Sequence, residues 1–470
     1  MRSMNATIEV LSEQEVQMIH DTSVKILETM GIYVPEKEVL KRCEAYGALV
    51  DYEQERMRLP RKALEDVLDQ LKSVNADHFA EEMRQQKISA HISTQVFYTD
   101  YLSKTCRYGL RDDNYKGFAL LEELENFPKA DPVVVASDVP SEISDVAGFL
   151  DIYKYSTKPG ATYVLTPVSA KYIIAMNKLM NQPSGYLLET ISPLSFKKDS
   201  LEMALLFAEH GGNLGIGPMA MGGATAPVTV AGTLALENAE ILASMFLVYV
   251  LTGRISGYSA PVHSLDMKTM LCSFGSANQA LFAVAAAQMS KFYGISAMTN
   301  AGLTDALMPD FQGGIEKGIT ACFNYLAGCR SMGAMGIVGA DQGINLEQLV
   351  LDNEWISYYN YIVSGFEVSE DTLGLDAVME AGVRGNFLNS DHTLDYWQES
   401  YLQSRIFLRD NFANWTAASQ PELLKRAHEF VEDKTAGYRE RQPVIAPSLC
   451  EELDRIAAEA EAEVKKQREA

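Results

Sequence analysis

Two acidic residues are the first candidates for acid–base chemistry. Glu189 ends the apolar stretch GYLLETIS (185–192), where a carboxylate needs a partner or a cationic ligand. Asp305 lies in TDALMPD (304–310) and is the second candidate, although aspartates in loops more commonly cap helices. We therefore predict Glu189 and Asp305 as the catalytic residues.

Aromatic side chains occur beside predicted loops, and ring faces attract cations. A few of them could line a box for a quaternary ammonium group, whereas the rest could equally pack a core or an interface. The predicted substrate-binding residues are Phe97, Tyr98, Tyr258, His263, Asn300, Phe311, Gln312 and Arg330. A substrate carboxylate would need a cationic anchor, for which Arg254, Arg330 and His263 are alternatives.

The usual cofactor and metal motifs are missing. The chain contains no GxGxxG that opens a helix, no GxxxxGKS, no HExxH and no GxSxG. Its seven histidines are isolated, so we predict no metal site. The six cysteines are scattered without a CxxC, which is typical of reduced thiols in a cytoplasmic protein.

Composition excludes some partners. A net charge of −23 argues against nucleic acid and anionic membranes. The most apolar run, ILASMFLVYVL (241–251), is shorter than the ~20 residues that span a bilayer. We expect a cytoplasmic protein without a membrane partner, and the apolar run favours a homo-oligomer.

The order of elements predicts an α/β fold, a (β/α)8 TIM-type barrel with a helical N-terminal layer and a C-terminal helical extension. Residues 1–88 form the layer, residues 89–420 the barrel and residues 421–470 the extension. In the barrel, apolar strands alternate with helical segments, which is typical of a parallel sheet covered by helices. Strands are expected at 132–137, 162–167, 185–192, 213–219, 254–260, 295–302 and 331–339, and helices at 198–210, 229–250, 275–291 and 312–329. The stretch 91–103 supplies the remaining strand or a lid hairpin, and chemistry should sit at the carboxyl ends of the strands.

Several segments resemble the trimethylamine methyltransferase superfamily, in its branch without pyrrolysine. They include LSEQEVQMIHDTSVKILETMGIYV at the start, GGATAPVTVAGTLALENAEILA (222–243), APVHSLDMKTM (260–270), DALMPDFQGGIEKG (305–318), NLEQLVLDNEWI (345–356), GFEVSEDTLGLDAVMEAG (365–382) and NFLNSDHTLDYW (386–397). The resemblance covers nearly the whole chain. It implies a barrel that moves a methyl group from an amine to the cobalt of a cognate corrinoid protein, with no cofactor held tightly by this chain.

The founding members carry pyrrolysine, whereas this sequence has only the twenty standard residues. The resemblance therefore implies a quaternary amine such as glycine betaine, proline betaine, carnitine or γ-butyrobetaine as substrate. Loop GIVGADQG (336–343) is the candidate neighbourhood of the missing residue. Gly222, Gly223, Gly336 and Gly339 are predicted to form a rim that admits the corrinoid, although glycines also serve tight turns.

Quaternary amines need little acid–base help, because the departing amine is neutral and needs no proton. Positive charge on nitrogen is lost as the methyl group moves, so a carboxylate touching nitrogen would hold the substrate and raise the barrier. We therefore predict an aromatic cage at the ammonium group, with Glu189 beside it only if that carboxyl group is neutral or hydrogen-bonded away. Two alternatives remain: a cobalt-independent lyase or hydrolase using Glu189 and Asp305, and a non-catalytic betaine-binding or corrinoid-docking scaffold.

Overall fold

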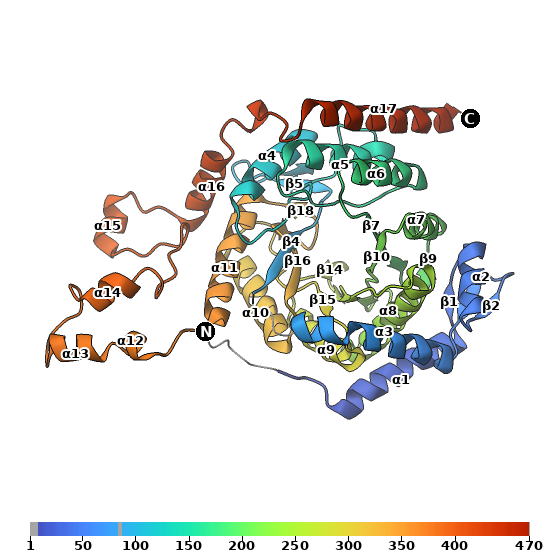
Figure 1. Ribbon diagram of the computed structural model, residues 1–470, viewed down its shortest axis with the longest axis horizontal. Helices are drawn as coiled ribbons and strands as arrows, with labels where there is room; N and C mark the ends of the chain where they lie inside the picture. Colours follow the sequence, from blue (N-terminus) through green and yellow to red (C-terminus); the bar gives the residue numbers. More distant parts are fainter. Residues whose placement is uncertain (1–7, 83–86, 470) are drawn as a thin grey trace.

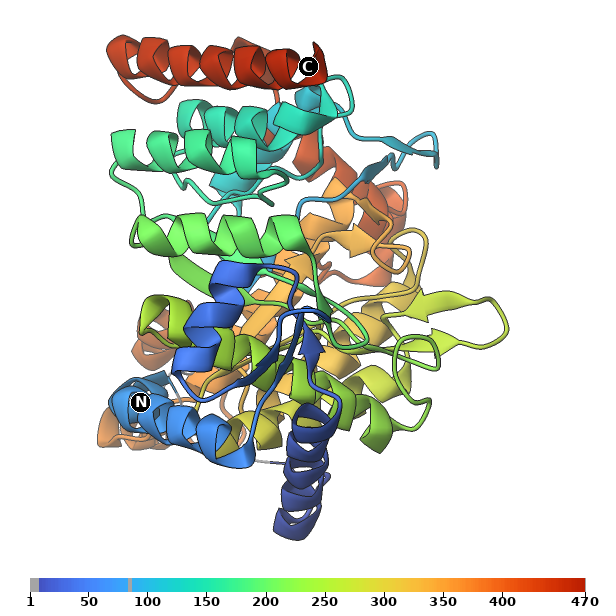
Figure 2. The same ribbon diagram turned by 90° about the vertical axis from the view of Figure 1, so that its right-hand side faces the viewer.

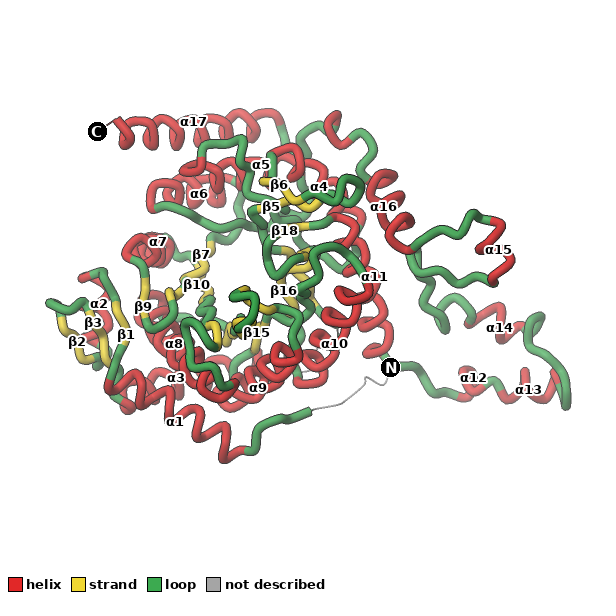
Figure 3. Tube along the Cα trace, turned by 180° about the vertical axis from the view of Figure 1, so that it is seen from behind, coloured by secondary structure: helices red, strands yellow, loops and turns green. Residues whose placement is uncertain are grey.

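The computed structural model describes residues 8–82 and 87–469 of the 470-residue chain (Figure 1). Strands lie at the centre of the molecule, and helices surround them in the views from front and back (Figures 1 and 3). The surrounding helices are α4 (Arg111–Glu123), α5 (Ser144–Tyr155), α6 (Pro167–Leu179), α7 (Lys198–Glu209), α8 (Val230–Thr252), α9 (Ala277–Tyr293), α10 (Phe311–Ala327) and α11 (Leu346–Ser364), with a short 3-10 turn η1 (Ser141–Ile143) before α5.

The strands pair in an order that runs around a ring. One parallel sheet has the order β12-β15-β16-β4, so the last strand of the series pairs with the first. A second parallel pair joins β7 to β10, and β11 pairs with β13 just beyond β10 and β12. These strands are β4 (Ser89–Ile92), β7 (Gly185–Leu188), β10 (Asn213–Ile216), β11 (Met221–Gly222), β12 (Tyr258–Ala260), β13 (His263–Asp266), β15 (Ala297–Thr299) and β16 (Ser331–Met335).

Two predicted strands of the ring are extended segments without a regular ladder. Parallel bridges join Gln95 to Val134 and Ala130 to Pro159. The Asn114 side chain takes the place of a neighbouring strand, because its amide bonds both the N–H and the C=O of Val134 at 2.9 and 3.0 Å. Among the described residues, no backbone hydrogen bond joins segment 159–165 to β7. The mixed α/β fold is thus confirmed, and full closure of the barrel stays a prediction.

Inward-facing positions of the ring are open. Along β7 and β10, buried residues alternate with exposed ones. Tyr186 points outward and stacks on Phe207 of α7, with 5.7 Å between ring centroids. Leu187 and Gly215 occupy the alternate positions and are exposed. Because the two faces of a strand alternate, these residues face a hollow interior.

The N-terminal layer begins with helix α1 (Glu13–Thr29). Ser12 and Glu15 form a capping box at its start. The layer also contains a small sheet, β2-β3-β1, which continues into β9 and β8 of the ring region. Its other elements are β1 (Ile32–Tyr33), α2 (Lys37–Ala45), β2 (Leu49–Asp51), β3 (Arg56–Arg58) and α3 (Arg61–Glu82), with β8 at Thr190–Ile191 and β9 at Ser195–Phe196.

Helix α8 is long and apolar enough to cross a membrane by length and composition alone, but 89% of its most apolar window is buried inside the protein. It packs against α1, α2 and α3 of the same chain. The apolar run 241–251 is therefore covered internally, and it gives no reason to expect a homo-oligomer.

Three hairpins stand at the end of the ring where the strands finish (Figure 2). The stretch 91–103 contains both predicted alternatives, because it ends strand β4 and begins a hairpin. The hairpins are β5 (Phe97–Thr99) with β6 (Cys106–Tyr108), β13 with β14 (Leu271–Ser273), and β17 (Ile337–Val338) with β18 (Gly343–Ile344).

The ring series ends at α11, within the predicted barrel segment 89–420. Residues 365–420, called the arm below, extend outward from α11 (Figures 1 and 3). The predicted extension then packs back, with α17 across α5 and α6 through the Lys154–Asp454 ion pair. The remaining elements are α12 (Glu370–Leu373), α13 (Leu375–Ala381), α14 (Asp391–Tyr396), α15 (Phe412–Ala417), α16 (Leu423–Lys434), η2 (Tyr438–Glu440) and α17 (Pro447–Glu469).

Candidate active site

A cavity of about 240 Å³ lies inside the ring, beside the gap between segment 159–165 and β7. It is lined by Ile92, Ser93, Thr94, Asp131, Ala161, Thr162, Tyr163, Val164, Gly185, Tyr186, Leu187 and Glu189. The lining therefore combines apolar and aromatic surface with two carboxyl groups. Among the described residues that line the cavity, none carries a basic side chain.

The two carboxyl groups of the cavity are both perturbed. Burial raises the pKa of Asp131 to about 6, although its Oδ1 accepts a hydrogen bond from the Ala161 N–H at 2.7 Å. Desolvation also raises the pKa of Glu189, against the opposing charge of Lys197. Both groups hold a proton more readily than an exposed acid does.

Tyr163 connects these acids electrostatically. Its hydroxyl lies 3.0 Å from Ser93 Oγ, and burial raises its pKa, with smaller contributions from Glu189, Asp341 and Asp131. Asp341 belongs to loop 336–343, where Ala340 and Asp341 both have positive φ angles of 53° and 65°. Partial desolvation raises the pKa of Asp341 too, although the residue remains exposed, while a hydrogen bond with Gln95 lowers it. The fields of three carboxyl groups thus meet at one phenol ring.

His263 is buried in a hydrogen-bond chain rather than free to act as a base. Its Nδ1 lies 3.0 Å from Gln279 Oε1, and its Nε2 lies 3.0 Å from Asn300 Nδ2. Gln279 donates to the Val262 carbonyl, which leaves its Oε1 to accept from His263. Burial lowers the pKa of His263 to about 4, so the ring is neutral at pH 7 and fixes the Asn300 amide.

Asp305 lies away from Glu189 and outside the cavity lining. Its carboxylate accepts hydrogen bonds from Ser273 Oγ at 2.7 Å and from the Phe274 N–H at 2.6 Å. Its own N–H donates to Glu316 Oε2 at 2.9 Å. Asp305 therefore fastens the β14 end to the loop before α10, and the structure does not bring the two predicted catalytic residues together.

The predicted aromatic residues are also separated. Tyr258 is buried under the helices, where its hydroxyl donates to Asn238 Oδ1 at 2.8 Å and its ring stacks on Tyr293. Phe97 and Tyr98 belong to hairpin β5–β6, where the Phe97 ring contacts Tyr108 and the Arg107 guanidinium lies over Tyr98. None of these three rings lines the cavity.

Three further predicted residues lie on or next to α10. Phe311 begins the helix with its side chain 84% exposed, and Gln312 donates to Glu316 Oε1 at 2.8 Å. Arg330 follows the helix, donates to the Tyr325 carbonyl at 2.9 Å and stacks over the Tyr325 ring. Arg330 thus precedes strand β16, at the end of the ring opposite to the strand carboxyl ends.

Local packing explains the predicted rim glycines. Gly223, Gly336 and Gly339 have positive φ angles of 93°, 79° and 66°, which favour glycine. A Cβ on Gly222 would lie 2.5 Å from Thr233 Oγ1, and one on Gly336 would lie 2.7 Å from Ile344 Cδ1. Gly222, Gly336 and Gly339 are buried, so of the four only Gly223 reaches the surface.

A buried ion pair beneath the mouth escaped sequence reasoning. Lys317 Nζ lies 2.9 Å from Asp352 Oδ2 and also donates to the Gly302 carbonyl at 3.1 Å. Asp352 accepts from the Gly336 N–H at 2.7 Å and from Trp355 Nε1 at 2.8 Å. The pair therefore joins the chain just after β15 to the chain just after β16. In the sequence, nothing in the hydrophobic pattern around Lys317 in GGIEKG predicts that this lysine is buried.

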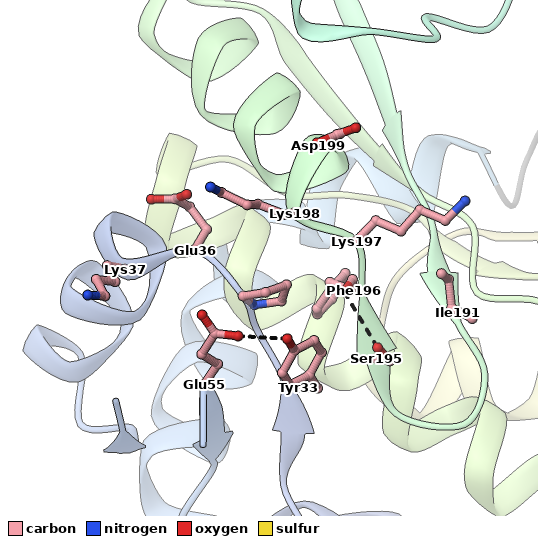
Figure 4. Close-up of a pocket in the computed structure, with 11 residues that line it drawn as sticks. Tyr33, Glu36, Lys37, Glu55, Ile191, Ser195, Phe196, Lys197, Lys198 and Asp199 are labelled. Carbon is pink, nitrogen blue, oxygen red and sulfur yellow. Dashed lines mark hydrogen bonds between the residues drawn. The ribbon is translucent and has the colours of Figure 1, made fainter. Parts of the chain in front are cut away.

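A larger groove of about 680 Å³ lies outside the ring, between the N-terminal sheet and α7 (Figure 4). Charged side chains of both signs line it, including Glu36, Lys37 and Lys198, and Tyr33 donates to Glu55 there at 2.6 Å. Lys197 points away from Lys198 and Asp199 in this view. Most of these charged side chains are exposed to solvent and both signs are present, so the cavity inside the ring is the better candidate. Across the described residues, no group of three potential metal ligands comes together.

Comparison with known proteins agrees with the resemblance. The family model for trimethylamine methyltransferase (MTTB) matches residues 1–465. Trimethylamine methyltransferase MttB of Methanosarcina barkeri is 32% identical over 246 residues, which is 52% of this chain and 49% of that protein. This alignment thus spans about half the length of that relative. Glycine betaine methyltransferase of Desulfitobacterium hafniense is 27% identical across 95% of both chains.

A crystal structure of the hydroxylamine MtmB complex covers 92% of this chain and 93% of its own, with 9% identity and a TM-score of 0.47. The family assignment rests on the family model, whose match extends over nearly the whole sequence. The chain belongs to the trimethylamine methyltransferase (MTTB) family.

Proposed function

We propose that this chain transfers a methyl group from a quaternary amine to Co(I) of a separate corrinoid protein. The methyl carbon leaves nitrogen, which keeps the bonding electron pair and departs as a neutral tertiary amine, and the carbon bonds to cobalt. The observation that carries the proposal is the cavity inside the ring, whose described lining holds Asp131, Tyr163 and Glu189 but no basic residue. Such a lining attracts a cation by its charge alone, so the cation can be a quaternary ammonium group that has no N–H to donate.

The raised pKa values of the two acids suit the reaction. Charge on nitrogen disappears in the transition state, so fully ionised carboxylates at the nitrogen would stabilise the substrate more than the transition state. Desolvation raises the pKa of both acids, so each carries less negative charge near neutral pH than an ordinary exposed acid, which weakens this effect. Similarity to a glycine betaine methyltransferase along 95% of both chains supports a quaternary substrate.

We expect the ammonium group to enter the cavity first, with any substrate carboxylate directed outward. Arg254 donates to the Gly211 carbonyl and Asn213 Oδ1 at the amino end of β10, and Arg330 precedes β16. His263 is neutral and already bonded. Lys197, whose charge acts on Glu189, is therefore the favoured carboxylate anchor.

The corrinoid protein is proposed to dock on the loops that follow the strand ends. Exposed apolar side chains surround this end of the ring, among them Leu102, Met219, Met267, Met270 and Leu307. Flexible methionines suit a surface that must accept a partner and release it. The lyase or hydrolase alternative receives less support, because Asp305 lies outside the cavity and already accepts two hydrogen bonds.

The test is methylation of Co(I) cobalamin, followed by its visible spectrum. Glycine betaine, proline betaine, carnitine, γ-butyrobetaine and trimethylamine are offered separately, first with free cobalamin and then with a corrinoid protein from the same genome. A methyl–cobalt spectrum with a quaternary amine and none with trimethylamine is expected. Turnover of trimethylamine alone, or no turnover of any of the five amines with the corrinoid protein present, would refute the proposal.

A binding experiment tests the cavity separately. Calorimetric titration with tetramethylammonium, which has no carboxylate, should show weaker binding to Asp131→Asn and Glu189→Gln than to the wild type. Asp66→Asn, on the outer surface of α3, is the matched control and should bind normally. Equal affinity of all four proteins would mean that the cation binds elsewhere.

A further inference from the structure

The helices of the arm (residues 365–420) do not pack into a hydrophobic core within this chain. Its four helices, α12 to α15, contain no buried residue. They contain between 4 and 7 residues each. Isolated helices shorter than about 12–15 residues are marginal in water, so these helices need a packing surface.

The sequence nevertheless specifies these helices. Ser369 accepts a hydrogen bond from the Thr372 N–H, Ser390 from the Thr393 N–H and Asn411 from the Asn414 N–H. Each side chain caps the first turn of a helix. The arm is therefore built as an ordered element, and the missing packing surface must come from another molecule.

The arm exposes enough apolar area for a stable interface. Its exposed apolar side chains are Phe366, Val368, Leu373, Leu375, Val378, Met379, Val383, Phe387, Leu388, Leu394, Trp397, Tyr401, Leu408 and Phe412. At about 200 Å² for each free aromatic side chain, the five aromatic ones alone leave roughly 600 Å² exposed. The aliphatic side chains bring the total exposed apolar area of the arm to at least the ~800 Å² per partner of a standard interface.

Anchors on α11 hold the arm in its outward direction. It leaves at Gly365 and returns where Ser404 Oγ donates to Glu354 Oε2 at 2.6 Å and Ile406 is buried. Arg409 Nη2 then donates to the Tyr358 hydroxyl at 2.6 Å. In two opposite views the arm lies outside the ring and does not cross its centre (Figures 1 and 3).

A complementary surface exists on α10 of the same chain. Phe311, Ile315, Ile319 and Phe323 follow one another at intervals of four residues, and all four are exposed. This spacing places them in one stripe along the helix. Gly314 and Gly318 lie within the helix, and a Cβ built on either would meet no atom within 4 Å. The outer face of α10 is thus apolar and open to close approach by another backbone.

We propose that the arm packs on α10 of a second copy of this chain, and that the exchange is reciprocal. Both surfaces belong to one chain, so a two-fold axis can bury both at once and close the assembly. A corrinoid protein is the less suitable occupant, because it must reach the strand carboxyl ends, whereas the arm lies to the side of the ring. The inference is independent of the proposed function.

Sedimentation velocity on the full-length chain at micromolar concentration tests the pairing. The wild type should have at least twice the mass of one chain. Val383→Glu combined with Leu388→Glu on the arm, and separately Ile319→Glu on α10, should each halve that mass. Val74→Glu is the matched control, since Val74 is exposed on α3, outside both surfaces.

Far-UV circular dichroism should be unchanged in Val74→Glu, and in the other variants it should lose no more than the signal of the four short arm helices, because the substituted side chains lie outside the core of the ring. A wild-type protein that sediments as a monomer would overturn the proposal. It would also be overturned if the mass increased only after a corrinoid protein was added. Retention of the full mass by the arm variant would overturn it as well. An arm variant that dissociates while Ile319→Glu does not would show that the arm sits on a surface other than α10.

Discussion

Replacing Asp131 by asparagine should make the protein more stable at neutral pH. The native pKa of Asp131 is about 6, against an ordinary value of 3.8. Between these two values the native state binds more protons than the unfolded state, so stability falls as pH rises. The difference corresponds to about 3 kcal/mol of stability lost above pH 6, at 1.36 kcal/mol for each pKa unit. Asparagine keeps an oxygen for the Ala161 N–H and carries no charge.

The assay is the melting temperature of Asp131→Asn and of the wild type at pH 4 and pH 7.5. The variant should melt a few degrees higher at pH 7.5, and the gain should shrink toward zero at pH 4. Asp266→Asn is the control with the opposite sign, because hydrogen bonds from the Thr269 and Lys268 N–H groups lower the pKa of Asp266. An equal or lower melting temperature of Asp131→Asn at pH 7.5 would refute the reasoning.

Three other outcomes follow from buried contacts. Burial lowers the pKa of His263 in the native state to about 4, below its ordinary 6.5. The free energy of unfolding should therefore rise by up to about 3 kcal/mol between pH 4 and pH 6.5. In urea titrations, His263→Gln should flatten that rise. Lys317→Met should destabilise the protein by about 3–5 kcal/mol in urea titrations, because it leaves Asp352 buried without its cation. Adding Asp352→Leu to the same chain should restore much of the lost stability. Gly336→Ala should lower the melting temperature, at a cost of about 1–3 kcal/mol, because its φ is +79° and the added methyl group meets Ile344.

The long helices were predicted well from runs of helical length, some of which bury one face, as α7 and α10 do, whereas α8 is buried on all sides. The structure places α7, α8, α9 and α10 within two residues of the segments expected at 198–210, 229–250, 275–291 and 312–329. The capping box of α1 joins residues only three apart, so the types of Ser12 and Glu15 are enough to specify it locally. The strand expected at 132–137 did not form as a ladder, because Asn114 satisfies Val134 from a distance of twenty residues.

The site was harder to predict, since it depends on contacts between distant segments. Glu189 was recognised because a carboxylate ended an apolar strand, and it does line the cavity. Asp131 and Tyr163 were not singled out, because the shifts in their pKa values come from desolvation and, for Tyr163, from the charges of acids on other segments of the chain. Tyr258 was chosen for its place at a strand, but sequence did not reveal which face of β12 carries it, and it points under the helices.

Two glutamates within α8 have a consequence for how the nascent chain is sorted. Glu240 accepts hydrogen bonds from Thr190, Ser192 and Leu194, and Glu237 accepts one from the Ala220 N–H. Both therefore serve the folded protein, and both lie in a 23-residue helix that is long and apolar enough, by length and composition, to cross a bilayer. An acid near the middle of a membrane-spanning helix costs about 3 kcal/mol during insertion. The carboxylates that hold loops in the finished fold thus also discourage the insertion machinery from accepting this segment during synthesis.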